Sequence, residues 1–226
     1  MLELKDVCKE FASSEGSVVK VLDGISLKAS AGDSISIVGP SGSGKSTLLN
    51  IIGALDKPTS GSVKLDGTDF SKAGDKQLAQ IRNRRIGFVF QMHHLLPQCS
   101  LIENVLLPAL AGGGKPEGGV HDRAVELLEK VGLKDKINSL PRQVSAGQRQ
   151  RAAIVRALIN SPALLLADEP TGALDAVIAR ETAKLLLELN RTERTALVVV
   201  THSQELAGQM ARKMTLSSGK LKADTE

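Results

Sequence analysis

Apolar and polar positions along the chain follow two periods, one typical of strands and one of helices. Alternating runs predict strands at residues 2–5, 25–28, 34–38, 62–67 and 86–91. Continuous apolar runs are typical of parallel strands buried on both faces, and they occur at 163–167 and 196–200. Helical spacing between start and stop residues predicts helices at 45–55, 75–84, 120–131, 143–160, 176–190 and 203–212. The last periodic stretch, 214–221, has the pattern of a hairpin.

Strands and helices alternate along most of the chain, which predicts an α/β fold with a mainly parallel sheet. The alternation stops between about residues 91 and 160, where only helices are predicted, one of them beginning at Leu101 and breaking near Pro108. We therefore expect an inserted helical subdomain at 91–160, in a single domain whose core comprises residues 1–90 and 161–226. Polar or glycine-rich composition predicts loops at 13–17 and 111–119.

Composition and charge restrict the class of protein. With 42% hydrophobic and 24% charged residues, the 226-residue chain is ordinary for a globular protein. The net charge is only +4, and with no Trp or Tyr there are few aromatic side chains for base stacking, which argues against a nucleic-acid partner. The first residues are unlike a signal peptide, and no apolar run approaches the roughly 18 residues of a membrane span. Cys8 and Cys99 are far apart, so we expect them to be reduced thiols. Together these features predict a cytosolic, soluble protein.

The stretch from Gly39 to Thr47 carries the most specific chemistry in the sequence. It has the spacing G-x-x-x-x-G-K-[ST] between a predicted strand and a predicted helix, which is the context of a phosphate-binding loop. The glycines allow close approach of the backbone, Lys45 can reach the β- and γ-phosphates, and the Ser46 hydroxyl can ligate Mg²⁺. The alternative is a glycine-rich turn that binds nothing. We expect ATP or GTP to be bound by Gly39, Pro40, Ser41, Gly42, Ser43, Gly44, Lys45, Ser46 and Thr47.

Two carboxylates follow the apolar run at 163–167. The carboxyl end of a buried strand faces the ligand crevice of an open α/β sheet. Asp168 is therefore suited to hold Mg²⁺, directly or through water, and Glu169 to accept a proton from the attacking water. His202 follows the run at 196–200 in the same way, so it can reach the γ-phosphate or hold Glu169 in place. The alternatives are two solvated acids in a turn and a structural histidine.

Further candidates lie beside these motifs. Gln91 ends a predicted strand and is expected next to the same site. Phe11 precedes a polar loop, where stacking on a base and a place at the edge of the core both stay open. Ser145 and Gln148 form the S-x-x-Q pattern of a capping box. A helix N-terminus with a Ser and a Gly, here Gly147, is also an anion site, and in a chain with one phosphate loop it suggests a site for another copy's nucleotide.

Together these motifs resemble the nucleotide-binding domain of an ATP-binding cassette (ABC) transporter over nearly the whole chain. The motifs that carry the resemblance stand in that family's order: Walker A at 39–46, Gln91, Val144-Ser145-Ala146-Gly147-Gln148, Walker B ending at Asp168, Glu169, Gly172-Ala173-Leu174-Asp175 and His202. The resemblance implies a P-loop NTPase fold of the RecA-like type, with an N-terminal antiparallel β subdomain and an inserted helical subdomain. It also implies hydrolysis of ATP with Mg²⁺.

The resemblance implies roles for individual residues as well. Phe11 would stack on adenine, and Gln91 would contact Mg²⁺ and sense the membrane subunit. The nucleotide held by the other protomer would be bound through Ser145, Gly147 and Gln148. Asp175 would communicate across the interface between the two copies.

A narrower resemblance concerns the group that contains lipoprotein-releasing, macrolide-efflux and antimicrobial-peptide-resistance ATPases. It rests on Gly87-Phe88-Val89-Phe90-Gln91, Leu95-Leu96-Pro97, Ile102-Glu103-Asn104-Val105 and Leu107-Pro108. It implies an ATP-dependent homodimer that works with separate integral membrane permease subunits, on the inner face of the cell membrane. The alternative is an ATP-dependent regulatory scaffold of a membrane complex. Ala146 leaves that open, because its methyl group replaces a usual second glycine; Ala173 and Ser203 also depart from the family pattern.

Overall fold

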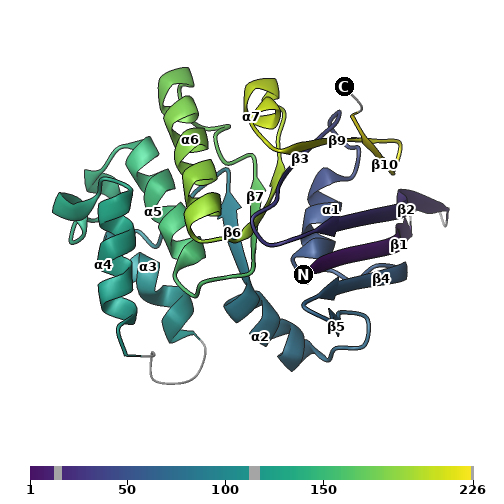
Figure 1. The fold of residues 1–226 in the computed structure, drawn as a ribbon, viewed down its shortest axis with the longest axis horizontal. Helices are drawn as coiled ribbons and strands as arrows, with labels where there is room; N and C mark the ends of the chain where they lie inside the picture. The colour runs from purple at the N-terminus through teal and green to yellow at the C-terminus, as the bar shows by residue number, and fades with distance from the viewer. Residues whose placement is uncertain (13–16, 112–117, 225–226) are drawn as a thin grey trace.

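The computed structural model describes residues 1–12, 17–111 and 118–224, which form two β-sheets flanked by helices (Figure 1). Most of the two loops predicted at 13–17 and 111–119 lies outside the described residues. Within the described ranges, no helix combines the length and the apolar character needed to cross a membrane.

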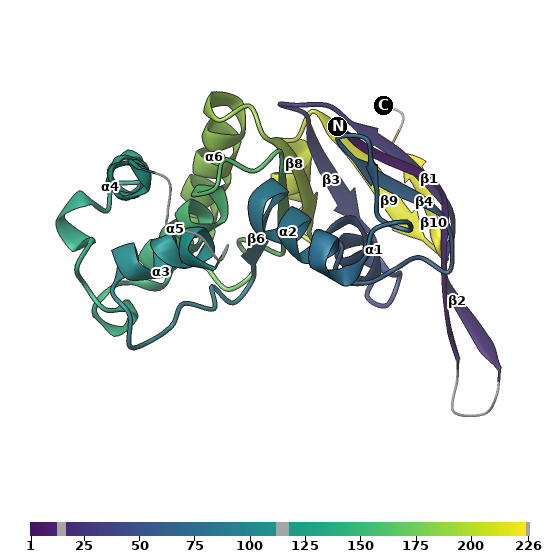
Figure 2. The same ribbon diagram turned by 90° about the horizontal axis from the view of Figure 1, so that it is seen from below.

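An antiparallel sheet of four strands is built from the first part of the chain, in the order β2-β1-β4-β5. Its strands are β1 (Leu2–Ala12), β2 (Val18–Ala29), β4 (Ser60–Leu65) and β5 (Thr68–Asp69). β1 and β2 extend well beyond the predicted strands at 2–5 and 25–28, because they pair in one long ribbon whose register shifts at bulges. Figure 2 shows this sheet at the end of the molecule opposite α4 (Val120–Lys130).

The second sheet has six strands in the order β10-β9-β3-β8-β7-β6. The parallel strands are β3 (Ser34–Val38), β6 (Ile86–Phe90), β7 (Leu164–Asp168), β8 (Ala196–Val200) and β9 (Arg212–Ser217). The last strand, β10 (Lys220–Ala223), is antiparallel to β9 and forms the predicted hairpin. Every residue of β3 and β8 is buried, as in a sheet covered on both faces. The predicted mainly parallel α/β arrangement is confirmed.

The apolar core lies on both faces of this sheet. Leu164 and Leu166 of β7 pack with α1 (Lys45–Ile52) and the antiparallel sheet, whereas Leu165 and Ala167 pack with the helices on the other face. The remaining helices outside 91–160 are α2 (Asp75–Arg85), α6 (Ala176–Thr192) and α7 (Gln204–Gly208). α7 is shorter than predicted, because the chain enters β9 at residue 212.

Residues 91–160 contain helices and no strand among those described. They form α3 (Leu101–Leu110), α4, α5 (Ala146–Leu158) and the 3₁₀ turns Lys134–Lys136 and Pro141–Gln143. The predicted break at Pro108 is wrong: α3 continues through its last turn to Leu110, and the Pro108 carbonyl accepts a hydrogen bond from Asn83 Nδ2 at 2.8 Å. α5 begins later than residue 143, because Ser145 caps it.

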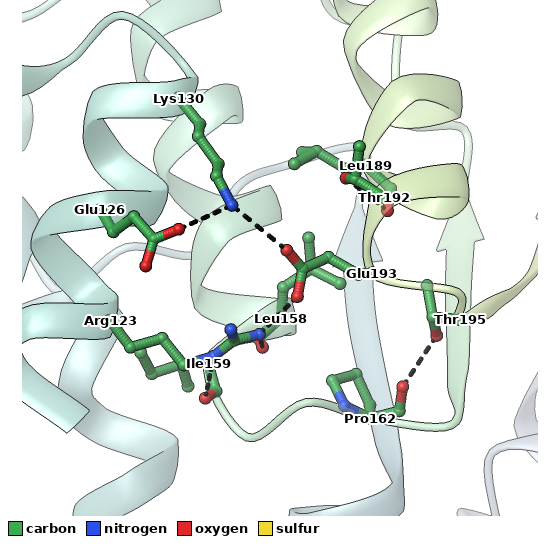
Figure 3. Close-up of polar contacts among 10 residues, drawn as sticks. All are labelled: Arg123, Glu126, Lys130, Leu158, Ile159, Pro162, Leu189, Thr192, Glu193 and Thr195. Carbon is green, nitrogen blue, oxygen red and sulfur yellow. Dashed lines mark hydrogen bonds and ion pairs between the residues drawn. The ribbon is translucent and has the colours of Figure 1, made fainter. Parts of the chain in front are cut away.

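An ion-pair cluster ties α4 to the end of α6 (Figure 3). The Glu193 carboxylate accepts a hydrogen bond from Arg123 Nη2 at 2.7 Å and lies 3.7 Å from Lys130 Nζ. Arg123 also donates to the carbonyl oxygens of Leu158 and Ile159, both at 3.2 Å. The ends of α4, α5 and α6 are therefore held together by one guanidinium group.

Candidate functional site

A cleft of about 630 Å³ opens where β7 and β8 end and α1 begins. The side chains and backbone that line it are those of Val21, Ser41, Gly42, Gly44, Lys45, Ser46, Thr47, Phe90, Gln91, Met92, His94, Asp168, Glu169, Val200 and His202. The cleft therefore joins most of the predicted phosphate loop to the residues predicted at the strand ends. Ligands of open α/β sheets bind at this end of the strands.

The phosphate loop connects β3 to α1 in a conformation that requires glycine at specific points. Gly44, which precedes α1, has a φ angle of 99°, in the left-handed region that favours glycine. A Cβ atom on Gly39 would lie only 2.2 Å from the carbonyl oxygen of Leu216. Gly39, Pro40 and Ser43 are not among the residues that line the cleft, and their contact with a nucleotide stays a prediction.

The Lys45 ammonium group is held inside this loop. Lys45 is only 7% exposed, and its Nζ atom donates hydrogen bonds to the carbonyl oxygens of Gly39 and Pro40 at 2.9 and 2.8 Å. The positive charge is therefore fixed beside the N-terminus of α1, whose backbone N–H groups also favour an anion. This arrangement suits the phosphates of a nucleotide.

Asp168 and Glu169 lie at the end of β7, between β6 and β8. Burial and the charge of Glu169 raise the pKa of the Asp168 carboxyl, and a hydrogen bond from Ser46 and the charge of Lys45 partly oppose this rise. A cation bound next to Asp168 would lower its pKa again, because it favours the ionised form. Asp168 is thus suited to a metal ion.

Glu169 is held in one orientation by the residues that follow β8. Its φ angle of 47° is left-handed, which is uncommon for a residue with a side chain. Oε2 accepts hydrogen bonds from the Thr201 hydroxyl at 3.0 Å and from the His202 N–H at 3.1 Å. Oε1 is buried and accepts no hydrogen bond from the residues that the structure describes. Glu169 lines the cleft, where an ionised carboxylate can act as a general base toward a bound water molecule.

Gln91 and His202 complete the group at the strand ends. Oε1 of Glu169 lies 3.4 Å from Nε2 of His202, whose side chain is 59% exposed. A Cβ atom on Gly172 would lie 3.0 Å from Nε2 of Gln91, so the glutamine amide rests against the loop that follows Glu169. The structure therefore brings together the four predicted polar residues at the ends of β6, β7 and β8.

The cleft fits a magnesium ion that is held jointly with a nucleotide. Within the part of the chain that the structure describes, no group of three or more His, Cys, Asp or Glu side chains could hold a metal by itself. Ser46, Gln91 and Asp168 all line the cleft and offer oxygen atoms. Mg²⁺ prefers oxygen ligands and commonly takes the rest of its shell from phosphates and water.

Other predicted site residues lie outside the cleft lining: Phe11, Ser145, Gly147, Gln148 and Asp175. Phe11 is 45% exposed on β1, and Lys9 Nζ lies 4.9 Å from its ring centroid. Ser145 Oγ accepts a hydrogen bond from the Gln148 N–H at 3.2 Å, and Gln148 Oε1 accepts one from the Ser145 N–H at 2.9 Å. The predicted capping box is confirmed.

The starts of α5 and α6 lie against each other. A Cβ atom on Gly147 would lie 2.4 Å from Cγ2 of Ile178, so this glycine allows close packing of the two helices. The Asp175 carboxylate caps α6 by accepting hydrogen bonds from the N–H groups of Val177 and Ile178 at 3.1 and 3.0 Å. Gly147 and Asp175 thus have structural roles within one chain.

Several residues of the cleft were missed by the sequence analysis. Val21 belongs to the part of β2 that alternation did not predict, and Met92 and His94 follow a strand end without any motif. Thr201, which orients Glu169, had a usable signal, because it lies between a buried strand and His202.

Comparisons with known proteins agree with this site. The ABC transporter family model matches residues 22–172. The lipoprotein-releasing system ATP-binding protein LolD of Legionella pneumophila (strain Paris) is 49% identical over 207 residues, which cover 92% of this chain and 91% of the relative. LolD 1 of Rhodopirellula baltica is 48% identical over 221 residues, which cover 98% of this chain and 96% of the relative.

Solved structures extend the agreement to three dimensions. A dimeric post-hydrolysis state of the ATP-binding cassette MJ0796, bound to ADP and Pi, superposes with a TM-score of 0.86 at 40% identity, covering all of both chains. A second dimeric structure of MJ0796 gives the same TM-score. The predicted P-loop NTPase fold is confirmed, and the transporter ATPase is favoured over the regulatory scaffold. The chain belongs to the ABC transporter family, as one of its ATP-binding and ATP-hydrolysing subunits.

Proposed function

We propose that this chain is the ATPase subunit of a lipoprotein-releasing transporter, and that it acts as a homodimer around two Mg·ATP. The observation that carries the proposal is the cleft, in which the phosphate loop faces Asp168, Glu169 and His202. The narrower assignment is supported by the LolD proteins, which are 46–49% identical over 92–98% of this chain. In this proposal, residues 91–160 are a helical subdomain inserted into a single ATPase domain.

Each residue of the cleft has a chemical role in the proposal. Lys45 and the backbone of the loop bind the phosphates, while Ser46, Gln91 and Asp168 hold Mg²⁺, which when bound neutralises phosphate charge. Glu169 orients the attacking water and accepts its proton, with His202 beside it. Phosphoryl transfer needs positioning and charge stabilisation more than covalent help, and these residues supply both.

The proposed homodimer gives a role to the predicted site residues that lie outside the cleft. Ser145 and Ala146 at the start of α5 are exposed, so they are available to a nucleotide held by another copy. We propose that Ser145, Gly147 and Gln148 of one protomer close over the phosphates bound by its partner, and that Asp175 contacts the interface. Two dimeric structures of the related cassette MJ0796 support this arrangement. Phe11 would contact the adenine ring.

Separate integral membrane permease subunits would receive the force of dimer closure, through the surface near Gln91 and the helical subdomain. The chain would then be cytoplasmic and peripheral on the inner face of the cell membrane. Support comes from the name of the LolD relatives, which are ATP-binding proteins of a lipoprotein-releasing system. No nucleic acid is needed in this function.

Two measurements test the proposal. The rate of ATP hydrolysis per subunit should rise with protein concentration, because each site needs two copies; a rate independent of concentration would contradict shared sites. The membrane proteins that co-purify with the tagged chain should then be reconstituted in vesicles that contain a fluorescent lipoprotein. ATP-dependent release of the lipoprotein is expected, and release of a macrolide or a peptide instead would assign the chain to another branch.

A further inference from the structure

Gln150 lies where α5 meets the ends of two parallel strands. Its side chain is only 2% exposed, and its Nε2 atom donates hydrogen bonds to the carbonyl oxygens of Phe90 at 3.0 Å and Pro170 at 2.9 Å. Phe90 directly precedes Gln91, and Pro170 directly follows Glu169. One buried amide therefore contacts the backbone next to both of these cleft residues.

The amide adds a connection between β6 and β7 at the point where their pairing ends. The two strands pair in register as far as Phe90 and Asp168, after which both segments leave the sheet. A buried carbonyl needs a hydrogen-bond donor, and Gln150 supplies one to the carbonyl of Phe90 and one to the carbonyl of Pro170. Its amide group has two hydrogens, one for each of the two carbonyl oxygens. A single planar group therefore sets the distance between the segment that follows β6 and the segment that follows β7.

A second residue of α5 fixes the other side of Gln91. The Arg156 guanidinium donates hydrogen bonds to the carbonyl oxygens of His93 at 2.7 Å and His94 at 2.6 Å. α5 therefore holds the backbone both before and after Gln91. Of these two residues, Gln150 is the one that also reaches the segment carrying Glu169, so it connects the backbone beside Gln91 to the backbone beside Glu169.

We propose that Gln150 is a positioning residue for ATP hydrolysis, which keeps Gln91 and Glu169 at a fixed separation across the cleft. The inference rests on the proposed roles of Gln91 and Glu169, and Gln150 itself does not line the cleft. A displacement of about 1 Å in a reacting group costs on the order of 100-fold in rate. Loss of this bridge should therefore lower the rate far more than the affinity for nucleotide.

The test variant is Gln150→Met, which keeps the length of the side chain and removes both donors. We expect kcat to fall by about 10–100-fold, with the KM and the dissociation constant for Mg·ATP essentially unchanged. The matched control is Val155→Ala, on the same helix and fully buried in the apolar cluster of that face. The control should lower the unfolding temperature and leave kcat per folded molecule as in the wild type.

Hydrogen exchange by mass spectrometry provides a readout that does not depend on activity. In Gln150→Met, peptides that cover 90–95 and 169–173 should exchange faster than in the wild type, and in Val155→Ala they should not. A wild-type kcat in Gln150→Met, or unchanged exchange in both peptides, would overturn the positioning role. If the wild-type chain itself did not hydrolyse ATP, the proposed function would fail, and the exchange measurement would still decide whether Gln150 holds both segments.

Discussion

Nε2 of His202 lies 3.4 Å from Oε1 of Glu169, and the backbone N–H of the same histidine donates to Oε2 at 3.1 Å. The Thr201 hydroxyl donates a further hydrogen bond to Oε2, at 3.0 Å. The end of β8 therefore sets the direction in which the Glu169 carboxylate points. A general base must be held within reach of the proton that it removes.

Glu169→Gln should remove the proposed general base and leave the hydrogen bonds around it in place. The amide oxygen can still accept the hydrogen bonds from Thr201 and His202, so we expect a folded protein that binds ATP normally. Hydrolysis should fall by about 10²–10⁴-fold, the range for loss of a general base, and ATP-bound dimers should accumulate. Light scattering with saturating Mg·ATP measures the dimer. If the variant stays monomeric under these conditions, the two-site arrangement is wrong.

Asp168→Asn should change the pH dependence of stability in the nucleotide-free protein. Because burial and Glu169 raise the pKa of Asp168, the folded state binds this proton more tightly than the unfolded state does. The contribution of Asp168 to stability therefore falls as the pH rises from the unfolded pKa, about 3.9, through the folded one. Removing the charge should raise the unfolding temperature at pH 7, by a few degrees at most, and the gain should vanish below about pH 4.

Thermal unfolding across this pH range measures the effect, and the same variant should lose Mg²⁺-dependent ATP binding. Asp175→Asn is the matched control, since it makes the same chemical change at an exposed helix cap, where Asn is as good as Asp. A control that gained as much stability as Asp168→Asn would contradict the explanation from burial and charge.

The parallel sheet and most of the cleft could be predicted from the sequence, for a common physical reason. Glycine spacing around Lys45 and the carboxylates after a buried apolar run depend on local chemistry, which can be read residue by residue. The long ribbon of β1 and β2 could not be predicted, because residues 10–12 and 18–20 at its tip are exposed on both faces, so no alternation of apolar and polar residues marks its end. The hydrogen bonds of Gln150 to two distant carbonyls depend on how α5 packs, which no local pattern records.

Arg123→Met should destabilise the fold through the cluster in Figure 3. The change leaves the Glu193 carboxylate, only 14% exposed, without its closest cation, and removes the donor to the carbonyls of Leu158 and Ile159. Loss of such partners costs about 1–3 kcal/mol of the free energy of unfolding, measured by urea denaturation. Lys130→Met removes the cation that lies 3.7 Å from Glu193, together with an exposed ion pair to Glu126 at 2.9 Å, so it should cost about 1 kcal/mol or less. Equal effects of the two variants would contradict this ranking.

Gly147→Ala separates the structural role of this glycine from its proposed contact with the partner's nucleotide. The added methyl group would lie 2.4 Å from Cγ2 of Ile178, so the free energy of unfolding should fall by about 1–3 kcal/mol. Ile178→Ala removes the clashing atom, and in the double variant the cost of Gly147→Ala should disappear, which urea denaturation of all four proteins would measure as a coupling. A neutral Gly147→Ala would contradict the clash. If the double variant is stable yet no longer dimerises with ATP, the methyl group must act at the interface, because the contact within the chain has been relieved.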